Sequence, residues 1–382
     1  MILFRKKVSR NPAYYSVMMV NNSTAPQKTA PLYITRFAAA CFVLCHHFFL
    51  NSVPVLINFQ EAVVYFFFLS GFVMVVSNKR FFETSTNVSH FSKSRYWVKR
   101  AAKIYPLYIF AYVLCVVLMC FVFRTDQFSL PSFCCEVLGI QTWLDKESLN
   151  YPGWSLSCEL FFYAVFPFSL RFLAGSSLKR VGIITIILFT LNIALNIYLS
   201  RFYKVADTGN WFLNILTGAS ISQNPIFRYP VFLFGNFAGL VYVRGFNSVK
   251  AGNIYGLLAC GLCIAFITFV TQLLPSKSPL LLNGVLCPVY FILVLALCSF
   301  NGKVLGFLSA KIFILAGGIS YGCYIMQVPV QLLFKYLFNS NQNFRSFGIF
   351  CVFILVLVTV SFLLYKYFEL PVKKFILSKF IR

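Results

Sequence analysis

Apolar runs of membrane-spanning length alternate with short polar segments along almost the whole chain. Runs of roughly 17–25 apolar residues are typical of transmembrane helices. Such segments, two of them short, occupy 32–50, 62–77, 104–123, 154–170, 181–199, 229–243, 253–273, 280–299, 312–333 and 347–364. The pattern predicts an all-α, polytopic membrane helix bundle with about ten transmembrane helices.

The same pattern leaves no room for a separate soluble domain. The longest polar stretches, 124–153 and 200–228, can form lids or short interfacial helices but not independent domains. We expect a cytosolic N-terminal tail over 1–31, one membrane domain over 32–371 and a basic cytosolic C-terminal tail over 372–382. The N-terminal tail lacks the pattern of a secretory signal.

Composition and charge agree with this topology. The chain is 59% hydrophobic and 11% charged, more apolar than a soluble core of this size could hide. With the N-terminus in the cytosol, 24 of the 33 Lys and Arg lie on the cytosolic side, 8 lie outside, and Arg36 lies within a span. This asymmetry follows the positive-inside rule and predicts that both termini are cytoplasmic. The net charge of +24 is therefore mostly a topology signal, and we expect membrane lipid, not nucleic acid, as a partner.

Arg36 and His47 are the most unusual pair in the apolar segments. Eleven steps of about 100° return a helix to within about 20° of its starting direction, roughly 16 Å further on, so both side chains share a face. Arg36 should lie near the inner surface and His47 nearer the middle of the bilayer. Ionisable groups at depth are costly and usually functional. The alternative is a packed helix in which Arg36 snorkels and His47 bonds to a neighbour.

Other polar residues recur at helical spacing. Arg100 and Lys103 lie one turn apart at the cytosolic boundary, which suits phosphate groups or lipid headgroups. Ser155, Glu159 and Tyr163 form a stripe that enters from the outer side. Glu159 is the only acid within the predicted spans, and it needs a cation, a donor or a proton.

Two further features are typical of ordinary packing. Ser70-Gly71 allows close backbone contact with a partner helix. Cys260 and Cys263 form a CxxC in mid-helix with no second pair nearby, which favours small buried residues over a metal or redox site. We expect no metal.

Taken in order, these segments resemble the integral-membrane acyltransferase-3 family, the O-acyltransferases of bacterial surface polysaccharides and related glycans. The resemblance covers about 31–371. Its motifs are Arg36-x-x-Ala39 with Val43 and His47, Phe67 to Phe72, Arg100 to Tyr108, Trp154 to Glu159, Ser320 to Tyr324, and Glu369 to Pro371.

The resemblance implies a membrane-embedded acyltransferase that moves an acyl group, usually acetyl, from acyl-CoA to a hydroxyl of a cell-envelope glycan or lipid-linked sugar. It implies a multi-pass protein of the bacterial cytoplasmic (inner) membrane, here without the hydrolase-like domain that some members append. Lys103 stands where a second Arg is common, and Gln327 stands where a His is common. Gln327 cannot titrate near neutral pH.

The residues suggest a division of roles for this reaction. Arg36, Arg100 and Lys103 would bind the phosphates of acyl-CoA, whose chain would run along the Ala39 and Val43 face. His47 would act as general base or carry the acyl group, and Glu159 would orient it or stabilise its protonated form.

Two other classes of function remain open at this point. In a glycan or small-molecule transporter or flippase, Arg36, His47 and Glu159 would line a polar path through the membrane. A structural subunit of an envelope complex is the third class. The acceptor also stays open among O-antigen, exopolysaccharide, peptidoglycan and a lipid-linked sugar.

Overall fold

The computed structural model describes residues 27–49, 61–83, 90–123, 129–144, 148–202, 223–246, 252–275, 278–337 and 347–381, which form helices and no strand. The helices of the first half are α2 (Pro31–Phe49), α3 (Glu61–Ser77), α4 (Arg80–Glu83), α5 (Lys93–Val117), η2 (Leu118–Val122), α6 (Leu130–Leu138), η3 (Gln141–Trp143), α7 (Gly153–Gly175) and α8 (Leu178–Phe202). Those of the second half are α10 (Pro225–Arg244), α11 (Asn253–Leu273), α12 (Pro279–Leu282), α13 (Cys287–Ser299), α14 (Gly302–Leu308), α15 (Lys311–Ile325), α16 (Gln327–Leu337), α17 (Phe347–Leu364), η6 (Tyr365–Glu369) and α18 (Leu370–Phe380).

The predicted helical membrane class is confirmed. Every predicted span overlaps a helix, and six described helices are long and apolar enough to cross a membrane, or up to eight if each of two bent pairs is one span. The count of about ten and the cytosolic position of both termini stay predictions. Most of the predicted N-terminal tail, residues 1–26, lies outside the described residues, whereas most of the predicted C-terminal tail forms helix α18.

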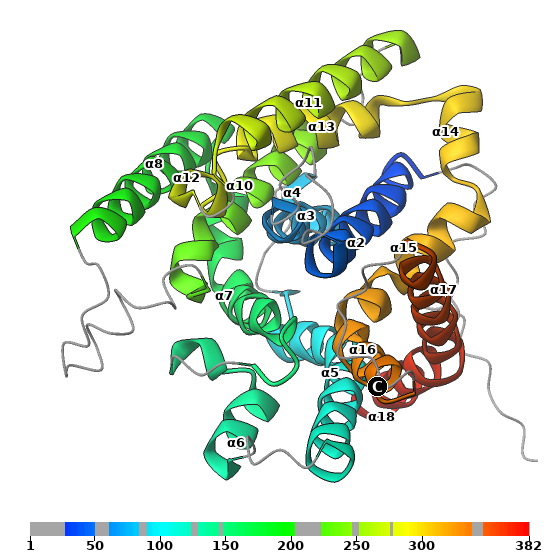
Figure 1. Cartoon of the computed structure of the whole chain (residues 1–382). Helices are drawn as coiled ribbons and strands as arrows, with labels where there is room; N and C mark the ends of the chain where they lie inside the picture. Colours follow the sequence, from blue (N-terminus) through cyan, green and yellow to red (C-terminus); the bar gives the residue numbers. More distant parts are fainter. Residues whose placement is uncertain are drawn as a thin grey trace, which may run out of the picture.

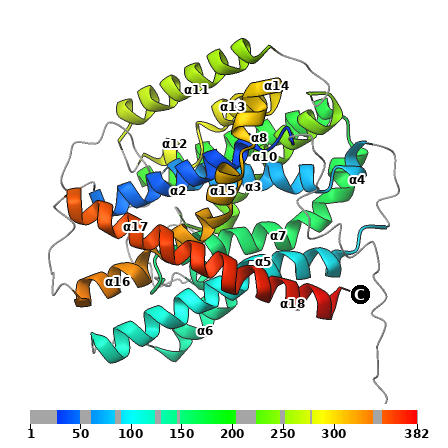
Figure 2. The same ribbon diagram turned by 90° about the vertical axis from the view of Figure 1, so that its right-hand side faces the viewer.

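Helices α2 and α3 lie at the centre of the bundle, with α8 and α11 to one side and α5 and α17 to the other (Figure 1). From a view turned by 90°, α11 lies along one outer edge of the bundle (Figure 2). The closest crossing joins α3 to α10, where Gly71 and Gly235 let the two backbones approach. A Cβ on Gly71 would overlap the carbonyl oxygen of Phe232. The predicted close contact at Ser70-Gly71 is therefore present.

Substituting Gly71 by Ala should destabilise the protein. The added methyl group meets backbone of α10, which cannot rotate away, and overpacking of this kind costs about 1–3 kcal/mol. Thermal unfolding of the purified protein is the measurement. Gly261→Ala in α11 is the matched control, because nothing lies within 4 Å of a Cβ there. Equal stability of both variants would contradict the role of Gly71.

Two predicted continuous spans are interrupted, which corrects the sequence analysis. The 312–333 segment bends by 63° between α15 and α16. Pro329 has no N–H for the carbonyl of Ile325, four residues earlier, and its ring disfavours a straight helix. The Asn150 side chain donates to that carbonyl at 3.1 Å instead.

The 280–299 segment is likewise two short helices, α12 and α13. The turn between them contains Gly284, whose φ of 83° lies in the left-handed region that favours glycine.

The segment from α6 to η3 positions the start of α7. The side chains of Gln141 and Ser157 bond across this junction: Gln141 donates to the carbonyl of Gly153 at 2.9 Å, and Ser157 donates to the carbonyl of Gly139. Glu136, which lies in the polar stretch 124–153, is only 1% exposed. Burial raises the pKa of Glu136 to about 7, although hydrogen bonds from neighbouring groups act in the opposite direction.

Glu136 should make stability depend on pH. Because its folded pKa is above the ordinary value of 4.5, ionisation destabilises the folded protein, so stability is full below pH 4.5 and falls as pH rises through 7. The free energy of unfolding should fall by at most about 3 kcal/mol. Thermal unfolding at about pH 5 and about pH 8 should show a smaller loss in Glu136→Gln than in the wild type. The surface variant Glu83→Gln should behave as the wild type, and an unchanged loss in Glu136→Gln would contradict the assignment.

Candidate active site

One polar cavity lies between α2, α3, α5, α7 and α15 and holds about 900 Å³ of space, part of it open to the outside. Arg100 lies at one end, where it bonds Ser77, the last residue of α3, and Ser155 lies at the other end, where it bonds Tyr324. The lining residues with polar side chains are Arg36, Ser70, Arg100, Lys103, Ser155, Glu159, Tyr163, Ser320, Tyr321 and Tyr324.

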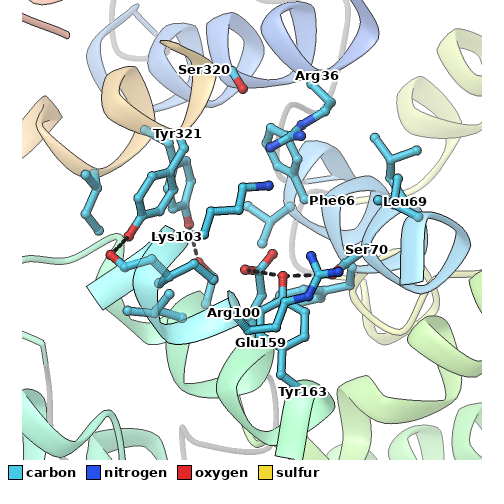
Figure 3. Close-up of a pocket in the computed structure, with 18 of the residues that line it drawn as sticks. Arg36, Phe66, Leu69, Ser70, Arg100, Lys103, Glu159, Tyr163, Ser320 and Tyr321 are labelled. Atoms are coloured by element: carbon cyan, nitrogen blue, oxygen red, sulfur yellow. Dashed lines mark hydrogen bonds between the residues drawn. The ribbon is translucent and has the colours of Figure 1, made fainter. Parts of the chain in front are cut away.

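Arg36, Arg100 and Lys103, three residues predicted to bind the donor, do converge in this cavity. Arg36 and Lys103 reach into the same space from opposite walls (Figure 3). Arg100 donates to the hydroxyl of Ser77 at 3.3 Å, while its buried Nε has no hydrogen-bond partner. Within the described part of the chain, none of the three has a carboxylate oxygen within 4.0 Å. Three cations with one lining carboxylate leave the cavity with an excess of positive charge.

That carboxylate belongs to Glu159, which is fixed by a short chain of hydroxyls. Tyr163 donates to Oε2 of Glu159 at 3.1 Å, and the Tyr163 and Ser70 hydroxyls lie 3.2 Å apart (Figure 3). The predicted stripe of Ser155, Glu159 and Tyr163 therefore faces the cavity. Ser70 was interpreted as a packing residue only, but it also lines the site, because Gly71 turns to α10 while Ser70 turns to α7.

A proline shapes the helix that carries Tyr163. Pro167 has no N–H to bond the carbonyl of Tyr163, four residues earlier. The indole Nε1 of Trp97 donates to that carbonyl at 3.1 Å. This bond ties α5 to α7 and holds the backbone of Tyr163 in place.

The other end of the cavity is closed by hydroxyls of α7 and α15. Tyr324 donates to Ser155 at 2.8 Å and also lies 3.3 Å from the carbonyl of Pro152. Tyr321 donates to the carbonyl of Ile104 at 3.1 Å. Both tyrosines belong to the Ser320 to Tyr324 motif. Their place in the site could not be predicted, because the sequence does not show how their helix packs against the others.

His47 does not line this cavity. It lies in the last turn of α2, and its ring packs edge-on against Tyr151 with centroids 5.1 Å apart. Tyr151 directly precedes Pro152, whose carbonyl lies at the hydroxyl end of the cavity. His47 is therefore beyond that end, and its predicted pairing with Glu159 is not formed in this structure.

The predicted donor route along α2 is not seen either. Neither Ala39 nor Val43 lines the polar cavity. Both are buried, with 4% and 2% of their surface exposed. On the same helix, Tyr33 fits against Gly317 of α15. Ala39 lines a separate apolar cavity, and the polar cavity passes along α3, α5 and α7 instead.

Glu159 is the only acid within the predicted spans, but acids outside those spans are buried as well. Glu369 is 5% exposed, and the charges of Lys103, Lys373 and Arg36 act on it. Glu61, which directly precedes the predicted span 62–77, is the first residue of α3 and 4% exposed. A span predicted from hydropathy ends where an acid occurs. The sequence therefore does not show that an acid at the end of a helix turns into the bundle.

Gln327 has a structural position at the α15–α16 break. It is 1% exposed and donates from Nε2 to the carbonyl of Tyr324 at 2.8 Å. Among the residues that the structure describes, no group of three or more His, Cys, Asp or Glu is arranged to hold a metal ion.

Comparison with known proteins shows which proteins this chain resembles. Residues 32–366 match the model of the acyltransferase-3 family, described as an acyltransferase domain. The chain is similar to acyltransferase MdmB of Streptomyces mycarofaciens, with 27% identity over 280 residues that cover 70% of this chain and 67% of the relative. No solved structure matches.

Proposed function

Because this chain belongs to the acyltransferase-3 family, and is therefore an acyltransferase and not a transporter, we propose that it moves an acetyl group from acetyl-CoA to a hydroxyl of a cell-envelope glycan or lipid-linked sugar. It would work in the bacterial cytoplasmic membrane, as a multi-pass protein. The donor, the acceptor and the membrane are parts of the proposal.

The observation that carries the proposal is the charge of the cavity. Arg36, Arg100 and Lys103 line it together with a single carboxylate, Glu159. Buried cations in excess are stable only with an anionic partner, and phosphate groups suit a cluster of Arg and Lys. Val63 and Met74 of α3 both line the cavity and lie eleven residues apart, about 16 Å along the helix. A long donor with phosphates at one end and a thioester at the other fits a cavity of this length that carries Arg100 at one end.

The reaction would take place toward the Ser155 end of the cavity. The acceptor hydroxyl would lose its proton to a ring nitrogen of His47 while its oxygen attacks the thioester carbonyl. An ester bond forms, the carbon–sulfur bond breaks, and the CoA thiolate recovers the proton. Glu159 would offset the cation cluster and hold Tyr163, and it would not orient His47 directly.

Transfer can be measured directly with purified protein in lipid vesicles, radiolabelled acetyl-CoA and an envelope glycan preparation. Label should move to the glycan. Glu159→Gln keeps the shape of the side chain but removes the charge that balances the cations. Losing a charged buried partner costs more than about 1.4 kcal/mol, so transfer should fall by at least about tenfold. Binding of acetyl-CoA without label on any acceptor would contradict the proposed reaction.

Arg36→Lys separates charge from geometry at the donor site. Lys keeps the positive charge but loses the planar fork that binds phosphate with two hydrogen bonds. We expect the KM for acetyl-CoA to rise about tenfold with kcat little changed, since one hydrogen bond to a charged group is worth about 1.5–3 kcal/mol. Lys79→Ala, at the surface outside the cavity, is the control. An unchanged KM in Arg36→Lys would move the donor phosphates elsewhere.

His47→Ala tests the proposed base. A positioned general base contributes about 10²–10⁴-fold, so kcat should fall by that factor while the protein still inserts and binds acetyl-CoA. His46→Ala is the matched control on the same helix. If His47→Ala transfers acetyl at the wild-type rate, the base is a group inside the cavity and the role of His47 is wrong.

A further inference from the structure

A second cavity lies on the opposite side of the α2–α3 pair from the polar one. It holds about 1020 Å³ between α2, α3, α11 and α13, and its walls are almost entirely apolar. It shares no lining residue with the polar cavity. Its lining residues are Thr35, Ala38, Ala39, Phe42, Glu61, Ala62, Tyr65, Cys260, Ile264, Ile267, Thr268, Tyr290, Leu293 and Leu297.

The cavity opens at the side of the bundle. Phe42 of α2 and Ile264 of α11 line it and are 43% and 57% exposed, so they form its rim. Helix α11 is an outer helix of the bundle and one of its apolar candidate spans (Figure 2). A rim of this kind faces the lipid phase, and a ligand would enter from the membrane and not from water.

One polar group inside the cavity lacks a partner. Glu61 is 4% exposed, and its Oε2 accepts a hydrogen bond from Tyr290 at 3.1 Å. Its Oε1 is buried and has no hydrogen-bond partner. A buried carboxyl oxygen without a donor is costly, so the site is incomplete as it stands. The other hydroxyls nearby are already engaged: Tyr65 and Thr35 bond each other at 2.7 Å.

We propose that this cavity is a binding site for a long-chain alcohol of the membrane, whose hydroxyl donates to Oε1 of Glu61 and whose chain fills the apolar walls. The residues of α11 that line the cavity run from Cys260 to Thr268, which is about 12 Å of helix. About this length of the alcohol's hydrocarbon chain would contact the protein. The charge of Arg228 already acts on Glu61, so a neutral donor suits the site better than a second cation. A fatty acid would place its own carboxylate against that of Glu61.

The test is photolabelling of the full-length protein in lipid vesicles with a fatty alcohol that carries a diazirine in its chain. Labelled peptides should come from α11 or α13. Unlabelled alcohol should compete about tenfold better than the alkane or the fatty acid of equal chain length, as expected for one hydrogen bond to a carboxylate. Equal competition by all three would overturn the headgroup contact, and labelling spread evenly over exposed helices would overturn the site.

Matched variants on one helix keep the test independent of folding. Ile267→Trp should fill the cavity and reduce labelling at least fivefold, whereas Leu262→Trp, on an exposed face of α11 outside the cavity, should label as the wild type. Glu61→Gln preserves shape and should reduce the advantage of alcohol over alkane. If Ile267→Trp labels like Leu262→Trp, the alcohol does not occupy this cavity. No outcome depends on acetyl transfer.

Discussion

The rest of the site depends on the cost of keeping three cations inside an apolar bundle. Arg36, Arg100 and Lys103 face one cavity with Glu159, and a charge out of water is tolerated only when it is paired or hydrogen-bonded. No carboxylate oxygen of the described residues comes within 4.0 Å of them. The excess of positive charge is the property that most clearly distinguishes this cavity from packed membrane helices, and the proposed anionic donor would relieve it.

Close backbone contact is what brings these side chains together. Gly71 sets α3 against α10, which leaves the neighbouring Ser70 free to face α7 and Tyr163. Gly317 admits Tyr33 and sets α15 against α2. Van der Waals packing of small residues is the main attraction between helices in lipid, so these contacts fix the bundle.

Prolines then adjust the helices around the cavity. Pro167 and Pro329 each remove a hydrogen bond from a carbonyl four residues earlier, and Trp97 and Asn150 donate to those carbonyls. Backbone groups cannot remain unpaired in an apolar medium, so each break requires a partner from another helix. Both partners join segments distant in sequence and hold the walls of the site. The same central helices, α2 and α3, also separate the polar cavity from the apolar one, so each helix presents two chemically different faces.

Sequence alone determined the helical membrane class and the residues that form the charged site. Apolar runs indicate burial in lipid directly. Arg36 and Glu159 stand out because charges are rare in such runs, and Arg100 and Lys103 stand out because they lie one turn apart next to the start of a run. It did not determine how those runs dock. Only the tertiary structure placed His47 outside the polar cavity, kept Ala39 and Val43 away from that cavity and turned Glu61 inward. The physical reason is that helical periodicity gives the direction of a side chain on its own helix, whereas what it meets depends on the packing of neighbouring helices.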